Sequence, residues 1–102
     1  MRSAHTTTLT CTKSLKLLAD FWTLRIIESL SHESLRYCEI QRAVGNVNPT
    51  TLSKKLDLLE NTKLVIRKED GDGLAVHYAL TPLGQRALPV LQEIRKFAAH
   101  FS

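Results

Sequence analysis

The side chains best suited to recognise a partner are a short run of hydroxyl and ammonium groups near the middle of the chain. Thr50, Thr51, Ser53 and Lys54 follow one another closely, and Lys55 comes next. Serine and threonine hydroxyls can hydrogen-bond several base edges, and lysine favours the guanine O6/N7 edge or a phosphate. The pattern therefore predicts contact with base edges and adjacent phosphates by the first four residues. Lys55, on a flank, is expected to contact phosphate or to lay its stem along the protein surface.

A helix over residues 49–60 must present this run. Asn48 can cap its first backbone N–H groups, and Pro49 suits the first helical position because its missing N–H would have no partner there. Three leucines at i, i+4 and i+7 then point into a core, namely Leu52, Leu56 and Leu59. The hydroxyl and lysine run lies on the opposite side and its flanks, and Asn48 is counted with it as a candidate DNA contact.

A second helix precedes this one. Residues 37–44 form an apolar pattern that buries Ile40 and Val44 and ends at Gly45, a residue common at helix C-caps. The two helices, joined through residues 45–48, have the form of a helix-turn-helix, whose second helix is the recognition element. The alternative is a helix pair that only builds a core.

Two strand-like runs, residues 65–69 and 74–80, surround a turn of alternating aspartate and glycine. Such residues tolerate positive φ, so the pattern predicts a β-hairpin, with residues 35–37 as a short third strand. Arg67 and Lys68 point to opposite faces, so at most one of them can meet a given line of phosphates. The acidic tip argues against insertion into a minor groove, and phosphate contact by the hairpin flank is expected. A purely structural hairpin is the alternative.

All of the excess positive charge lies on these elements. Residues 36–68 hold seven basic and three acidic side chains and so carry the whole net charge of +4, while the rest of the chain is neutral. A phosphate-facing surface requires such a concentration of charge. Arg36, at the start of this segment, is therefore a further candidate DNA contact. A lysine-rich solvated face without a partner is the alternative.

The terminal helices carry more apolar surface than a core of this size covers. The last helix opens at Thr81-Pro82, must kink or divide at Pro89, and repeats apolar residues at near-heptad spacing. A first helix, starting near Lys13, adds further apolar residues such as Phe21. Exposed stripes of this kind usually mark a partner surface. We therefore expect a homodimer interface made by Leu15, Leu18, Leu91, Ile94, Phe97, Ala98 and Phe101. Folding of the stripe back onto its own domain is the alternative.

No residue pattern supports catalysis, a cofactor or a metal site. Cys11 and Cys38 form no CxxC pair, the four histidines are scattered, and no Ser/His/Asp set, carboxylate pair or phosphate-cradling glycine loop occurs. Cys38 is predicted to be a buried small hydrophobe. Cys11 precedes a helix, where thiols can be reactive. A structural or incidental Cys11 is the alternative.

The chain of 102 residues suffices for one small domain. Its 43% apolar and 24% charged residues are typical of a globular protein. No apolar run approaches the ~20 residues that span a bilayer, and the first nine residues lack the apolar core of a signal peptide. We expect a cytoplasmic protein without a membrane partner, with residues 1–10 as a flexible arm and residues 11–102 as the domain.

The motifs on these elements resemble the HxlR-type branch of the MarR-like winged-helix regulators. They are a cysteine upstream of Trp22-Thr23 and the segments LRYCEI at 35–40, LSKKLDLLE at 52–60 and VHYALTPLG at 76–84, the last being the most specific. The resemblance covers nearly the whole chain. It implies a bacterial transcription factor that dimerises through its first and last helices and binds a pseudo-palindromic operator. In some relatives the N-terminal cysteine senses oxidants or electrophiles, a role that would map to Cys11.

The chain departs from the family pattern at three places. LADF at residues 18–21 replaces a glycine-glycine-lysine run, Lys63 stands where glycine commonly follows the recognition helix, and Lys55 stands where arginine is usual. Lysine lacks the planar fork with which arginine reads a base bidentately. A positive φ at Lys63 would cost about 1 kcal/mol. The recognition helix is therefore expected to end one or two residues earlier, at Asn61.

Together these features predict a mainly α fold with a small antiparallel β-hairpin, a winged helix-turn-helix with extra N- and C-terminal dimerisation helices. The expected function is that of a transcriptional regulator that binds specific double-stranded DNA as a homodimer, with a redox or electrophile response through Cys11. The competing interpretation is a winged-helix protein-interaction module that does not bind DNA. Nothing in the pattern indicates a small-molecule effector.

Overall fold

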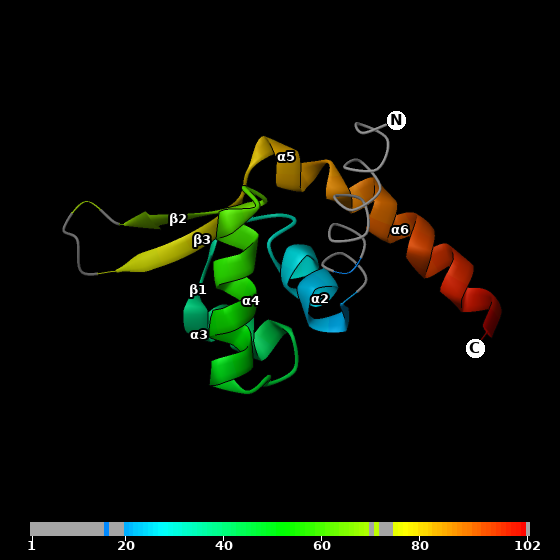
Figure 1. Cartoon of the computed structure of the whole chain (residues 1–102), viewed down its shortest axis with the longest axis horizontal. Helices are drawn as coiled ribbons and strands as arrows, with labels where there is room; N and C mark the ends of the chain where they lie inside the picture. Colours follow the sequence, from blue (N-terminus) through cyan, green and yellow to red (C-terminus); the bar gives the residue numbers. More distant parts are fainter. Residues whose placement is uncertain (1–15, 17–19, 70, 72–74, 102) are drawn as a thin grey trace, which may run out of the picture.

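The computed structural model describes residues 16, 20–69, 71 and 75–101. Figure 1 shows α4 crossing the middle of the molecule, the β2–β3 hairpin projecting on one side and α6 extending on the other. The predicted fold class, a mainly helical winged helix with a small antiparallel sheet, is confirmed. The elements in chain order are α2 (Phe21–Ser29), β1 (Leu35–Arg36), α3 (Tyr37–Ala43), α4 (Pro49–Asn61), β2 (Val65–Glu69), β3 (Val76–Leu80), α5 (Pro82–Gln85), α6 (Ala87–Ala98) and the 3-10 helix η1 (Ala99–Phe101).

The sheet has the strand order β1-β3-β2, and both pairings are antiparallel. The predicted hairpin and its short third strand are thus confirmed. Because cross-strand partners share a face, the register places Arg36, His77 and Lys68 in one row across the sheet. Tyr78 and Arg67 lie opposite one another in the next row, which belongs to the other face.

Helices α2, α3 and α4 enclose the core together with the start of β2 and one residue of α6. Each of its fully buried aliphatic side chains contributes about 1.5–3 kcal/mol relative to an exposed one. The predicted burial of the three α4 leucines, of Ile40 on α3 and of its C-cap residue Val44 is confirmed. The core consists of Ile26, Ile27, Leu30, Ile40, Val44, Val47, Leu52, Leu56, Leu59, Leu64, Val65 and Leu91.

The backbone after α4 shows which conformation Lys63 adopts. The helix ends at Asn61, as expected, yet Lys63 still adopts a positive φ of 67°. Its N–H donates to the Glu60 carbonyl at 3.0 Å, and the next N–H, of Leu64, donates to the Leu59 carbonyl at 3.0 Å. These two bonds form a Schellman motif, which normally takes glycine at this position. The expectation that an earlier helix end would spare Lys63 the strain is therefore wrong, because the motif itself requires the left-handed conformation.

The C-terminal helix is divided, as predicted from Pro89, but the break lies at Arg86. Proline lacks the N–H that would bond the carbonyl four residues earlier, and its ring clashes with that carbonyl. The carbonyl concerned belongs to Gln85, where α5 ends. The break therefore precedes the proline by one helical turn.

The Thr-Pro-Leu-Gly segment joins the hairpin to the end of α4. The Thr81 hydroxyl donates to the Lys63 carbonyl at 2.5 Å and accepts from the Gly84 N–H at 3.0 Å. A Cβ at Gly84 would lie 2.1 Å from the Leu64 carbonyl oxygen, so only glycine allows this approach. Close packing against the backbone of Leu64 thus explains why the Thr-Pro-Leu-Gly motif has glycine at its last position.

Candidate nucleic-acid interface

The first turn of α4 is held by a side-chain cap. The Asn48 amide oxygen accepts from the backbone N–H groups of Thr50 at 2.8 Å and Thr51 at 3.4 Å. The predicted cap is confirmed. The Asn48 side chain is exposed, but its oxygen is committed to the helix, so only its NH₂ group remains to donate to a ligand.

The outer face of α4 carries the predicted hydroxyl and lysine run. Thr50, Ser53 and Lys54 are exposed, and Thr51 is half-buried. The face opposite holds the buried leucines of the core. The structure therefore brings these four residues together on one accessible, polar surface.

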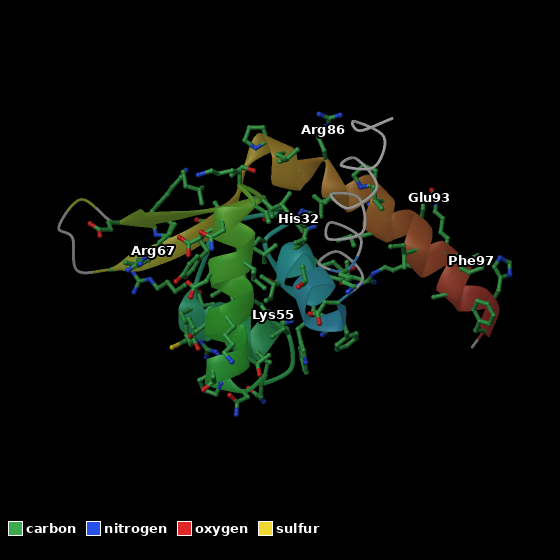
Figure 2. All side chains as sticks on the ribbon, in the orientation of Figure 1. His32, Lys55, Arg67, Arg86, Glu93 and Phe97 are labelled. Atoms are coloured by element: carbon green, nitrogen blue, oxygen red, sulfur yellow. The ribbon has the colours of Figure 1, made fainter. Side chains whose placement is uncertain are left out.

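Lys55 is placed differently. Its Nζ lies 3.2 Å from Asp20 Oδ1, and the two side chains are partly exposed, at 25% and 29%. Figure 2 shows Lys55 on α4, beside α2. The structure thus uses this ammonium group to tie α4 to the start of α2, rather than directing it outward with Lys54.

Asp20 is the residue that makes this tie possible, and the sequence patterns did not single it out. Its carboxylate accepts from the Thr23 N–H at 2.9 Å and from the fully buried Thr23 hydroxyl at 3.2 Å, so it also caps α2. Burial raises the pKa of Asp20, but the Thr23 backbone hydrogen bond and the pairing with Lys55 outweigh it, and the net pKa lies below its usual value. An aspartate directly before an apolar helical run is a local N-cap signal that could have identified it.

Tyr37 is a second residue that the sequence patterns did not assign to this interface. Its hydroxyl lies 2.9 Å from the Pro49 carbonyl oxygen and 3.2 Å from Ser53 Oγ. It therefore fastens the first residue of α3 to the first turn of α4. No local signal could have shown this contact, because its partners are 12 and 16 residues away.

The turn between α3 and α4 begins with a hydrogen-bonded helix end. Gly45 and Asn46 both have positive φ, at 99° and 58°. The Gly45 N–H donates to the Arg42 carbonyl at 3.3 Å and the Asn46 N–H donates to the Gln41 carbonyl at 2.8 Å, so this helix also ends in a Schellman motif. The predicted C-cap at Gly45 is confirmed.

The basic residues of the sheet divide between its two faces. Arg36 lies in the row with His77 and Lys68. Arg67 lies opposite Tyr78, on the sheet face that also carries the buried Val65. Burial raises the pKa of Tyr78, the Arg67 charge lowers it, and the charges of Glu60 and Asp57 on α4 raise it further. Arg67 is therefore on the sheet face that packs on the core, whereas Lys68 is on the other face.

The cysteines have different outcomes. Cys38 is exposed, so the prediction of a buried small hydrophobe is wrong. On a helix that buries Ile40 and Val44, position 38 lies roughly 200° from position 40 and so faces solvent. Cys11 lies outside the described residues. Within the described part of the chain, no group of His, Cys, Asp and Glu could hold a metal ion.

The predicted apolar stripe is exposed over most of its described length. Phe97 is 66% exposed and Phe101 is 78% exposed, and their rings meet edge to face with centroids 5.3 Å apart. Ile94 and Ala98 are also exposed. Leu91 differs, because it is only 4% exposed and belongs to the core of the chain itself. Leu15 and Leu18 lie outside the described residues.

The stripe borders a shallow apolar hollow of about 260 Å³ between α2 and α6, lined by Phe21, Leu24, Leu91, Ile94 and Ala98 among others. Beside it, the Arg95 guanidinium pairs with the Glu28 carboxylate and joins the two helices. No helix in the described ranges is long and apolar enough to cross a membrane.

Comparison with known proteins places this architecture. A sequence model of HxlR-like helix-turn-helix proteins matches residues 17–102. The HTH-type transcriptional regulator YvaP of Bacillus subtilis is 31% identical over 90 residues, which cover 87% of this chain and 83% of YvaP. A MarR-family transcriptional regulator from Porphyromonas gingivalis W83 has a solved structure that is 34% identical, with a TM-score of 0.77 and coverage of 87% and 88% of the two chains. The reduced form of YodB from B. subtilis is 27% identical, with a TM-score of 0.79 and coverage of 88% and 89%.

The family match includes the whole helix-turn-helix, the wing and the C-terminal helix. The matched relatives are transcriptional regulators rather than enzymes. The resemblance inferred from the motifs is thereby confirmed. The chain belongs to the HxlR-like helix-turn-helix family and is a transcriptional regulator of the helix-turn-helix type.

Proposed function

We propose that this regulator binds specific double-stranded DNA as a homodimer on a pseudo-palindromic operator. The observation that carries the proposal is the construction of α4. Its first turn is capped by Asn48 and fastened by Tyr37, and it presents Thr50, Ser53 and Lys54 on an exposed face. A helix that is fastened at its first turn and presents hydrogen-bonding groups outward is suited to reading the major groove.

The wing supports backbone contact. Arg67 is exposed on the sheet face that packs on the core, and it is the wing residue proposed to reach a phosphate next to the recognition helix. Lys68 and Arg36 share the other face of the sheet. They can add to the positive field that attracts DNA, but not to the same line of phosphates as Arg67.

The dimer is proposed to form through the exposed stripe of α6. A patch containing Ile94, Phe97 and Phe101 is large for a surface that stays in water. In a symmetric dimer the two copies of α4 would enter successive major grooves about one helical turn apart. Leu15 and Leu18 are proposed to contribute to the same interface, whereas Leu91 is not needed there.

A response to oxidants or electrophiles through Cys11 is proposed as an addition to DNA binding. The relative YodB has been solved in diamide-treated and quinone-bound forms. Oxidant-dependent release of DNA should therefore disappear in Cys11→Ser. Cys38→Ser is the matched control, because Cys38 is the second cysteine of the chain and its thiol is exposed. If release of DNA persists in Cys11→Ser and is lost in Cys38→Ser, the responsive thiol is Cys38 and the proposal for Cys11 fails.

The DNA-binding proposal is tested by fluorescence polarisation of a labelled random-sequence duplex in a salt titration. The logarithm of the binding constant should fall linearly with the logarithm of salt concentration, and Lys54→Ala should reduce the slope by about 0.9 if it removes one phosphate contact. Lys96→Ala is the control, since Lys96 lies on α6 and pairs with Glu93. An unchanged slope in Lys54→Ala would count against a DNA role for this face.

The same assay separates the competing function. A winged-helix module that binds only proteins would use the apolar stripe and would show no binding to duplex at micromolar protein and low salt. Binding with a steep salt dependence excludes that alternative.

A further inference from the structure

The Tyr37 hydroxyl donates its proton to the Pro49 carbonyl oxygen. The hydroxyl lies 2.9 Å from the Pro49 carbonyl oxygen, which can only accept, and 3.2 Å from Ser53 Oγ, which can do either. A phenol has a single proton. That proton therefore goes to Pro49, and in the bond between Tyr37 and Ser53 the serine must be the donor.

We infer that Tyr37 makes Ser53 a reader of an exocyclic amino group, a specificity that rests on the proposed DNA binding. With its proton directed at Tyr37, Ser53 can offer a base only the acceptor lone pairs of its oxygen. It is exposed on the outer face of α4, where a base edge would lie. In the major groove the donors are adenine N6 and cytosine N4, whereas guanine O6, guanine N7 and thymine O4 are acceptors. Ser53 would thus favour adenine or cytosine and disfavour guanine and thymine.

The surroundings hold this arrangement in place. The Tyr37 ring is half-buried against the core, and Pro49 is the first residue of a capped helix, so donor and acceptor are both fixed before DNA arrives. An isolated serine hydroxyl rotates to suit its partner and pairs with donors and acceptors alike. Tyr37 is therefore a positioning residue for specificity, and removing its hydroxyl should broaden base preference rather than abolish binding.

The first experiment selects bound duplexes from a randomised pool with the native protein, Tyr37→Phe, Ser53→Ala and the control Tyr78→Phe. The native protein and Tyr78→Phe should enrich adenine or cytosine at one position of each half-site. Tyr37→Phe should admit guanine and thymine there, lowering the discrimination by about 5-fold, as expected for one neutral hydrogen bond. Its salt slope and its preferences at the other positions should not change. Ser53→Ala should lose the same preference, and adding Tyr37→Phe to it should have no further effect.

The second experiment identifies the amino group in the selected duplex. Replacing adenine by purine removes N6, and replacing cytosine by pyrimidin-2-one removes N4. The relevant replacement should weaken binding of the native protein about 5-fold and leave Ser53→Ala nearly unchanged. If Tyr37→Phe keeps the native base preference, the inference is overturned while DNA binding stands. If the native protein binds no duplex at low salt, the proposed function fails as well.

Discussion

The start of α4 and the end of α6 are both exposed, but they are built in opposite ways. At the start of α4 the polar side chains are tied to one another across helices, Tyr37 to Ser53 and Lys55 to Asp20. At the end of α6, the large aromatic side chain of Phe97 is exposed to solvent, and its ring contacts are with His100 and Phe101 of the adjoining η1. Figure 2 shows Arg67 on the hairpin and Phe97 on α6 at opposite sides of the molecule.

This contrast indicates which of the two surfaces has its geometry set within one chain and which needs a partner. Polar groups that satisfy one another hold their geometry without a partner, so the surface proposed to read DNA is preorganised. An apolar patch gains free energy only when another surface covers it. Recognition and dimerisation should therefore respond to different substitutions.

The largest effect is expected for Phe97→Asp, which should weaken dimerisation through the exposed end of α6. A carboxylate in the proposed dimer interface would be buried without a partner, and the loss of a central aromatic anchor costs about 2 kcal/mol or more. The dimer Kd should therefore rise by roughly 30-fold or more. Sedimentation velocity over a concentration series measures this change. Lys96→Gln is the control, because it lies on the same helix and changes the net charge by the same amount. A native circular dichroism spectrum together with an unchanged Kd would remove Phe97 from the interface.

Lys63→Gly, at the end of α4, should stabilise the fold without affecting dimerisation. Glycine adopts the positive φ of this Schellman motif without the steric cost that lysine bears, so unfolding free energy should rise by about 1 kcal/mol. Urea unfolding at one protein concentration measures the gain, and the dimer Kd should stay the same. Lys63→Ala retains the strain and should show no gain. Equal stability of the two variants would contradict a strained Lys63.

Asp20→Asn should produce the smallest effect and is confined to the tie between α2 and α4. Asparagine still caps α2 but cannot pair its charge with Lys55, so unfolding free energy at neutral pH should fall by less than about 1 kcal/mol. The folded pKa of Asp20 lies below its usual value of 3.8. The carboxylate therefore stabilises the fold fully above that usual value, and the contribution is lost as pH falls through the lower folded value.

The measurement for Asp20 is urea unfolding of the native protein and the variant at neutral and at acidic pH. The difference between them should shrink at acidic pH, where the native carboxylate becomes protonated. Lys55→Met should lose a similar amount, and the double variant should lose little more. A difference that does not depend on pH would mean that charge pairing is not what Asp20 contributes.

Local signals predicted most of the recognition helix. The cap at Asn48, the proline at its first position and the leucine spacing act within one or two helical turns, and each reappears in the structure. The same signals placed the hairpin and its short third strand. Helical spacing from Ile40 would also have placed Cys38 on the solvent side, so the wrong prediction there neglected a signal that was present.

Other features of the interface depend on contacts between distant residues. Lys55 was predicted to be a surface cation because no residue close to it in the sequence is its partner. Its partner Asp20 lies 35 positions earlier in the chain. The side of the sheet on which Arg67 lies follows from strand register and helix packing, which alternation alone leaves undecided.

The amino-acid sequence by itself determined where the helices and strands lie, which faces are apolar, and where the positive charge collects, because these depend on spacing and composition along the chain. Only the tertiary structure decided which polar groups are available to a ligand. The availability of a hydroxyl or ammonium group depends on what lies within hydrogen-bonding distance in space. For Ser53 and Lys55 those partners, Tyr37 and Asp20, come from other helices.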